Sequence, residues 1–162
     1  MDLSQLINLA NRYRIDESDN FRELSNLSIY CQDDVSQIEA KIYEPVMCLI
    51  LQGGKITSIG EQHVELRSGD ALVVSHDLPV LSRIIQASPS EPYIAVLLAL
   101  DLGVMRSLRD QIATAVLPKA SSRSLASWRA DDAWLKPLVR YFELMNDPTD
   151  AKVLGPAIVL EI

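Results

Sequence analysis

The sequence has only two cysteines and two histidines in 162 residues. Cys31 and Cys48 are too few for a disulfide framework, and both lie in apolar runs, so we interpret them as reduced core residues. Neither His63 nor His76 has a second histidine or a cysteine at metal-ligand spacing. We therefore expect neither a bound metal nor a cofactor.

The sequence also lacks a basic cluster and a long hydrophobic run. The formal net charge is −7, and the nearest approach to a cluster is Lys119, Arg123 and Arg129. Phosphate binding needs clustered cations, so this chain is not expected to bind DNA by itself. The longest apolar runs, Val46–Leu51 and Ile94–Leu100, are too short to cross a bilayer, and the first residues have no signal-peptide pattern. These features predict a cytoplasmic protein with no membrane contact.

The residue types of a catalytic triad occur once, in Ser75-His76-Asp77. Neighbouring residues of a strand point to opposite faces, so these three side chains cannot adopt triad geometry. Cys48 lies in an apolar strand pattern, a poor environment for a thiolate. We expect no catalytic residues, although a metal-independent enzyme that uses His63 or His76 as an acid or base stays open as an alternative.

From Leu27 to Leu100 short apolar runs alternate with turn signals such as Gly53-Gly54 and Gly69-Asp70. About eight antiparallel strands at this spacing predict a sandwich or a closed barrel. We interpret Gly53-Gly54 as a hairpin turn. The runs are Leu27–Gln32, Ser36–Tyr43, Val46–Leu51, Lys55–Ile59, His63–Arg67, Ala71–Ser75, Val80–Ala87 and Pro92–Leu100.

Helical periodicity is present at residues 2–13, from Asp101 to about Val116, from about Asp131 to Asn146, and after Pro148. Pro137 predicts a kink or a late start in the third of these helices. Residues 118–130 are expected to form an exposed connection. One stripe of the third helix is a candidate dimer contact, with packing on its own barrel as the alternative. The stripe consists of Trp134, Leu138, Tyr141 and Met145.

Polar residues inside the strand patterns are candidates for a ligand site. Arg83 shares one predicted face of its strand with Leu81 and Ile85, so its guanidinium must reach out to solvent, pair with a carboxylate such as Asp70 or Asp77, or face a polar cavity. Gln52 and Lys55 flank the Gly53-Gly54 turn, where they could equally satisfy backbone groups.

Three ordered motifs carry a resemblance to a known family. The run Tyr43–Lys55, YEPVMCLILQGGK, is followed by Ser68–Pro79, SGDALVVSHDLP, and then by Ala87-Ser88 and Pro92-Tyr93. Together they resemble the N-terminal domain of AraC-type (AraC/XylS) transcription regulators. The resemblance implies a mainly β, cupin-like antiparallel barrel with flanking helices that senses a small molecule and forms a homodimer. It implies a helix-turn-helix DNA-binding domain after Ile162, through which alone DNA would be bound.

The predicted organisation follows from this resemblance. Residues 1–24 are expected to be a helix and an arm, residues 25–117 the barrel and its following helix, and residues 118–162 the connection and the dimerisation and linker helices. A ligand-free dimerisation module remains an alternative to the sensor. The candidate effector-pocket residues are Gln52, Lys55, Ser75, His76, Arg83 and Tyr93.

Overall fold

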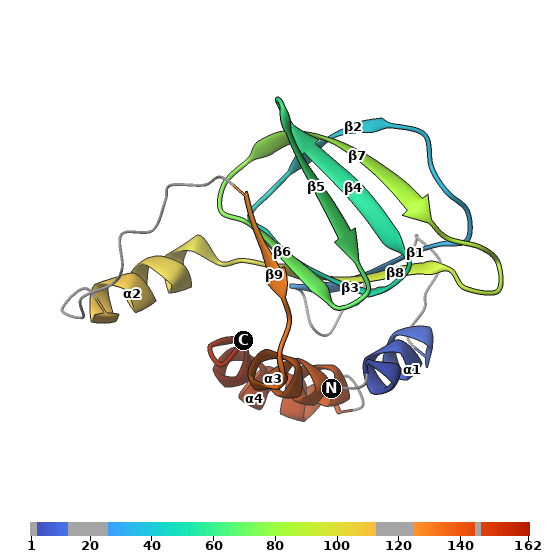
Figure 1. The fold of residues 1–162 in the computed structure, drawn as a ribbon. Helices are drawn as coiled ribbons and strands as arrows, with labels where there is room; N and C mark the ends of the chain where they lie inside the picture. Colours follow the sequence, from blue (N-terminus) through green and yellow to red (C-terminus); the bar gives the residue numbers. More distant parts are fainter. Residues whose placement is uncertain (1–2, 13–25, 113–124, 145–146) are drawn as a thin grey trace.

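Two antiparallel β-sheets face each other in the computed structural model, which describes residues 3–12, 26–112, 125–144 and 147–162. Sheet A has the strand order β1-β8-β3-β6-β9, and sheet B has the order β2-β7-β4-β5 (Figure 1). The chain crosses between the sheets repeatedly, which gives the predicted cupin-like barrel. The strands are β1 (Leu27–Gln32), β2 (Glu39–Tyr43), β3 (Val46–Gln52), β4 (Gly54–Ile59), β5 (Gln62–Arg67), β6 (Asp70–Val74), β7 (Leu78–Gln86), β8 (Tyr93–Ala99) and β9 (Leu125–Arg129).

Three helices cover the outer face of sheet A: α1 (Ser4–Arg12), α3 (Asp132–Glu143) and α4 (Pro148–Val159). This cover explains why β3 is apolar on both faces. Leu49 and Leu51 belong to the cluster under the helices, whereas Cys48 and Ile50 face sheet B. Side chains alternate along a strand, so two apolar faces require two apolar neighbours. No described helix is long and apolar enough to span a membrane.

The predicted hairpin at Gly53-Gly54 is wrong. β3 pairs with β6 and β8, whereas β4 pairs with β5 and β7. The two strands around Gly53 therefore belong to different sheets, and Gly53 is the corner where the chain passes from sheet A to sheet B. Its φ of 79° is a left-handed conformation that favours glycine. The predicted turn at Gly69, with φ of 87°, is confirmed.

Two further expectations about the C-terminal part need correction. Residues 125–129, predicted as connection, form β9 at the edge of sheet A, paired with β6. α3 continues through Pro137 without a late start, and its first turn is capped by the Asp131 carboxylate, which accepts a hydrogen bond from the Trp134 amide. The helix α2 (Leu102–Ile112) begins where predicted, and residues 113–116 lie outside the described ranges.

The centre of the proposed dimer stripe on α3, Leu138 and Tyr141, faces the interior of this chain. Leu138 is 1% exposed and Tyr141 is 3% exposed, both in the cluster between α1, α3, α4 and sheet A. Trp134 is half-buried, and its indole donates a hydrogen bond to the Ile162 carbonyl. Met145 lies outside the described residues. A single chain thus already buries the centre of this stripe, which favours packing on its own barrel over a dimer contact.

Candidate functional site

A cavity of about 820 Å³ lies between the two sheets, at the end of the barrel where β1 and β2 run as edge strands. In the described part of the chain no strand pairing joins β1 to β2. The volume is in the range of small-molecule sites. Much of the wall is apolar, formed by Leu27, Val46, Cys48, Ile84, Ala95, Leu97 and Ala99.

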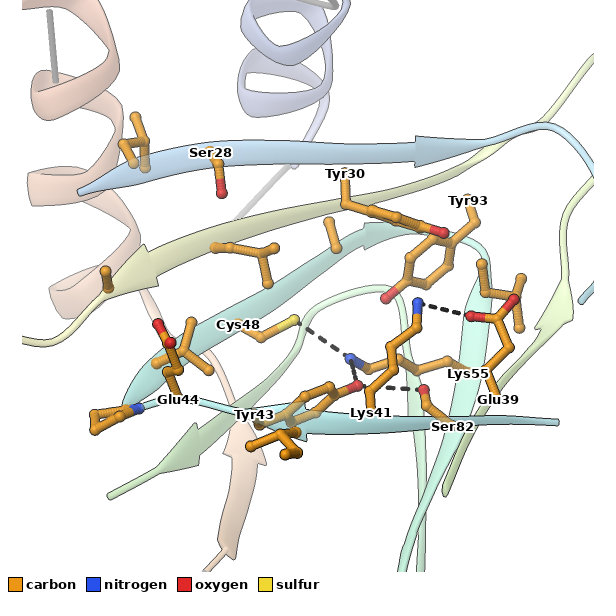
Figure 2. A pocket seen from close by; sticks show the side chains of 18 of the residues that line it. Ser28, Tyr30, Glu39, Lys41, Tyr43, Glu44, Cys48, Lys55, Ser82 and Tyr93 are labelled. Carbon is orange, nitrogen blue, oxygen red and sulfur yellow. Dashed lines mark hydrogen bonds and ion pairs between the residues drawn. The ribbon is translucent and has the colours of Figure 1, made fainter. Parts of the chain in front are cut away.

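Lys55 brings a charge into this apolar interior. Alternation along β4 turns Lys55 and Thr57 inward, and Lys55 is only 6% exposed. Its Nζ donates to the Tyr43 hydroxyl at 3.4 Å and lies 3.7 Å from Cys48 Sγ (Figure 2). Burial acts to lower the pKa of Lys55, but the opposing effect of Cys48 and Tyr43 is larger, so the pKa is raised above its ordinary value. Lys55 is therefore a buried ammonium at neutral pH.

Aromatic side chains and hydroxyls surround this ammonium. The Tyr43 ring lies 5.3 Å from Lys55 Nζ, and the Tyr43 hydroxyl donates to Ser82 Oγ at 3.2 Å. Tyr93 projects into the cavity and meets Tyr30 edge-on, with 6.1 Å between ring centroids (Figure 2). Burial, followed by the neighbouring Cys48, Tyr43 and Tyr30, raises the pKa of Tyr93 well above its ordinary value. Its hydroxyl therefore keeps its proton and can donate a hydrogen bond.

A second lysine lies at the cavity mouth. Lys41 of β2 forms an ion pair with Glu39 at 2.8 Å, and its Nζ lies 5.5 Å from the centroid of the Tyr30 ring on β1. The hydrogen bond with Glu39 raises the pKa of Lys41, partly opposed by burial. Because Lys41 has a carboxylate partner and Lys55 has none among its contacts in the described structure, Lys55 is the cation available to an anionic ligand.

Of the six predicted pocket residues, the structure brings Lys55 and Tyr93 into the cavity. Gln52 lies at the corner between the sheets, where its side-chain amide donates to the Pro92 carbonyl at 2.9 Å. Ser75 and His76 are exposed after the end of β6 and form a hydrogen bond with each other at 3.1 Å. These three residues do not line the cavity.

Arg83 lies on the outer face of β7. The inner face of that strand carries Leu78, Val80 and Ile84, so Arg83 and the half-exposed Leu81 point to solvent. The predicted partner Asp70 contacts Arg129 instead, at 3.3 Å. An exposed guanidinium is hydrated and needs neither a buried carboxylate nor a polar cavity.

We expect Arg83→Met to change the free energy of unfolding by less than about 0.5 kcal/mol, because exposed side chains without special contacts contribute little. Chemical denaturation of wild type and variant checks this. A loss of a few kcal/mol would instead reveal a stranded partner charge.

Sequence reasoning missed several polar residues of the cavity, namely Tyr30, Glu39, Lys41, Tyr43 and Ser82. A usable signal was present, because Glu39, Lys41 and Tyr43 alternate along β2 and therefore share one face. In the described parts of the chain, no three His, Cys, Asp or Glu side chains are grouped so that they could hold a metal ion.

The fold and the cavity define a cupin-like barrel with a ligand-sized interior. The family model described as the AraC-type transcriptional regulator N-terminus matches residues 23–162. The chain belongs to this family, as its motifs indicated. A search of curated proteins found no match.

Among solved structures, the chain is similar to ToxT from Vibrio cholerae. One ToxT structure, bound to (E)-4-(8-methylnaphthalen-1-yl)but-3-enoic acid, has 16% identity and a TM-score of 0.50, and the match covers 80% of this chain and 54% of ToxT. Another has 14% identity and a TM-score of 0.47, with 82% and 58% covered. A cupin superfamily protein from Desulfitobacterium hafniense has 18% identity and a TM-score of 0.36, with 46% and 66% covered. The chain thus spans little more than half the length of ToxT.

Proposed function

We propose that this chain is the effector-sensing domain of an AraC-type regulator, and that its effector is a small carboxylate with an apolar body. The observation that carries the proposal is the Lys55 ammonium, buried in the cavity beside hydroxyl and thiol groups. A buried charge is costly unless it is paired, and a ligand carboxylate would supply the missing negative charge. The apolar wall would bury the rest of the ligand.

The polar groups around Lys55 suit a carboxylate head group. A carboxylate oxygen accepts hydrogen bonds only, and Lys55 and the hydroxyl of Tyr93 are both donors. Hydrogen bonds between charged groups are stronger than neutral ones, so Lys55 would anchor the ligand and Tyr93 would orient it. The similar fold of ToxT bound to a naphthalenyl butenoic acid supports the same ligand class, an acid with an apolar body.

The regulatory part of the proposal comes from the family. We propose that effector binding changes sequence-specific DNA binding by a helix-turn-helix domain of the same protein, and that the protein acts as a cytoplasmic homodimer. The net charge of −7 agrees with DNA contact through another domain. Because Leu138 and Tyr141 are buried within one chain, the dimer contact would use other side chains, and the exposed Val153 and Leu154 of α4 are candidates.

Decanoate is expected to raise the melting temperature of the chain in a concentration-dependent way, because a ligand that binds only the folded state stabilises it. Decanol, which has the same apolar body without the charge, should stabilise it less. Lys55→Met keeps an apolar stem and removes the charge, so its affinity for decanoate should fall about tenfold or more, roughly 1.4 kcal/mol. Thermal shift and isothermal calorimetry measure both effects.

Lys41→Met is the matched control for this experiment. Lys41 is a lysine of the same cavity, but its charge is exposed at the mouth and paired with Glu39, so its loss should weaken decanoate binding much less. Equal stabilisation by decanoate and decanol, or equal effects of the two substitutions, would contradict the role of Lys55. No stabilisation by any apolar acid would favour the ligand-free dimerisation module.

A further inference from the structure

The same cavity holds a thiol next to the buried ammonium. Cys48 lies on the inward face of β3, lines the cavity, and places its Sγ 3.7 Å from Lys55 Nζ. We propose that Cys48 is a covalent modification site for electrophilic carbonyl compounds with an apolar body, such as α,β-unsaturated ketones. This inference rests on the proposed function in one respect, since both ligands would enter the same cavity.

The position of Lys55 supports reaction at Cys48 in particular. A cysteine reacts as its thiolate, and a lysine ammonium beside the sulfur attracts the negative charge that develops there. Cys48 and Lys55 come from β3 and β4, which lie in different sheets, so the two groups meet only in the folded barrel. Figure 2 shows both side chains pointing into the same space, with the sulfur on the cavity side of its strand.

The reaction needs no oxidant or reductant. Cys48 loses its proton to water and its sulfur forms a bond to the β-carbon of the enone. The π electrons of the C=C bond move toward the carbonyl, which becomes an enolate, and a proton from water is added at the α-carbon. The product is a saturated ketone joined to Cys48 through a thioether. Lys55 and Tyr93 line the same cavity as Cys48, so the Lys55 ammonium and the Tyr93 hydroxyl would donate hydrogen bonds to the developing negative oxygen.

The second cysteine provides an internal control. Cys31 on β1 is half-buried, more accessible than Cys48, which is 1% exposed, and it does not line the cavity. Accessibility alone therefore predicts that Cys31 reacts first. We predict the reverse order. The cavity concentrates an apolar enone, and the sulfur of Cys48 lies in that cavity beside the Lys55 ammonium.

The test treats the native chain with pentyl vinyl ketone and follows both cysteines by peptide mass spectrometry. We expect Cys48 to be alkylated at least about tenfold faster than Cys31, no adduct with the saturated ethyl pentyl ketone, and loss of the preference in urea. Lys55→Met, checked for folding by circular dichroism, should slow Cys48 about tenfold and leave Cys31 unchanged. Faster reaction at Cys31, or equal rates in Lys55→Met and wild type, would overturn the inference.

Decanoate separates the failure of this inference from the failure of the proposed function. If decanoate binds and Cys48 does not react in the native chain, the covalent site is wrong and the carboxylate sensor stands. If Cys48 reacts preferentially and decanoate neither binds nor protects it, the covalent site stands and the carboxylate effector is wrong. Protection of Cys48 by bound decanoate would support both.

Discussion

Gly53→Ala is expected to destabilise the chain by about 3–5 kcal/mol and to lower its melting temperature by roughly 10 °C or more. Two costs add. The φ of 79° is unfavourable for alanine, and the added Cβ would lie 2.4 Å from the Gln86 carbonyl oxygen and 3.1 Å from Tyr93 Cα. Both obstacles are backbone atoms of paired strands, so neither can rotate away. Differential scanning calorimetry of wild type and variant measures the loss.

Gly60→Ala is the matched control, since Gly60 also has a positive φ, 55°, but its added Cβ would meet nothing within 4 Å. It should lose only the conformational part, about 1 kcal/mol. Equal stability of the two variants would show that the contact of the added Cβ with Gln86 and Tyr93 does not contribute to the loss of stability. Because Gly53 packs against Tyr93, a folded Gly53→Ala chain should also bind decanoate more weakly.

The corner at Gly53 shows what sequence patterns could not supply. Gly53-Gly54 between two apolar runs is the local signature of a hairpin, and a glycine is needed in either case. What separates a hairpin from a corner is the identity of the strands that pair with β3 and β4. Those partners lie elsewhere in the chain, on β6, β8, β5 and β7, and no local pattern encodes them.

Strand alternation predicted two faces for β7 but not which face lies inside. The inner face carries Val80, Ser82 and Ile84, and the outer face carries Leu81, Arg83 and Ile85. Each face combines two apolar residues with one polar residue, so hydrophobicity does not distinguish them. The strand pattern therefore left three possibilities open for Arg83: a guanidinium that reaches to solvent, a carboxylate partner, or a polar cavity. Ser82 is the polar residue that lines the cavity.

The barrel itself was predictable because turn residues and apolar runs recur between Leu27 and Leu100. β9 was not, because an edge strand pairs on one side only and its residues are exposed apart from Leu125. Lys55 and Tyr93, which belong to the motifs that carry the resemblance, line the cavity. The neighbours that give Lys55 its properties, Tyr43 and Cys48, come from other strands and required the fold.

Replacing Leu138 and Tyr141 together by glutamate is expected to unfold the chain. Both side chains are buried in the cluster under sheet A, and the Tyr141 hydroxyl is hydrogen-bonded to the Asn26 side chain. Two carboxylates in an apolar cluster, with two large side chains removed, should cost more than about 5 kcal/mol, which is comparable to the whole stability of a domain. Circular dichroism and light scattering on the same samples would show loss of cooperative unfolding together with loss of defined size.

The control also introduces two glutamates, but at exposed positions of the same helix: Ala133→Glu with Lys136→Glu. It should fold with nearly wild-type stability, since glutamate is well tolerated on exposed helix positions and favourable in the first turn. This comparison shows whether Leu138 and Tyr141 pack within one chain or form a contact between two chains. A folded, monomeric Leu138→Glu/Tyr141→Glu chain, from a wild type that is dimeric, would place these two residues at the dimer contact. Unfolding of the double variant alone would show that α3 uses this face to hold the helices on the barrel, so that any dimer contact must use a different surface.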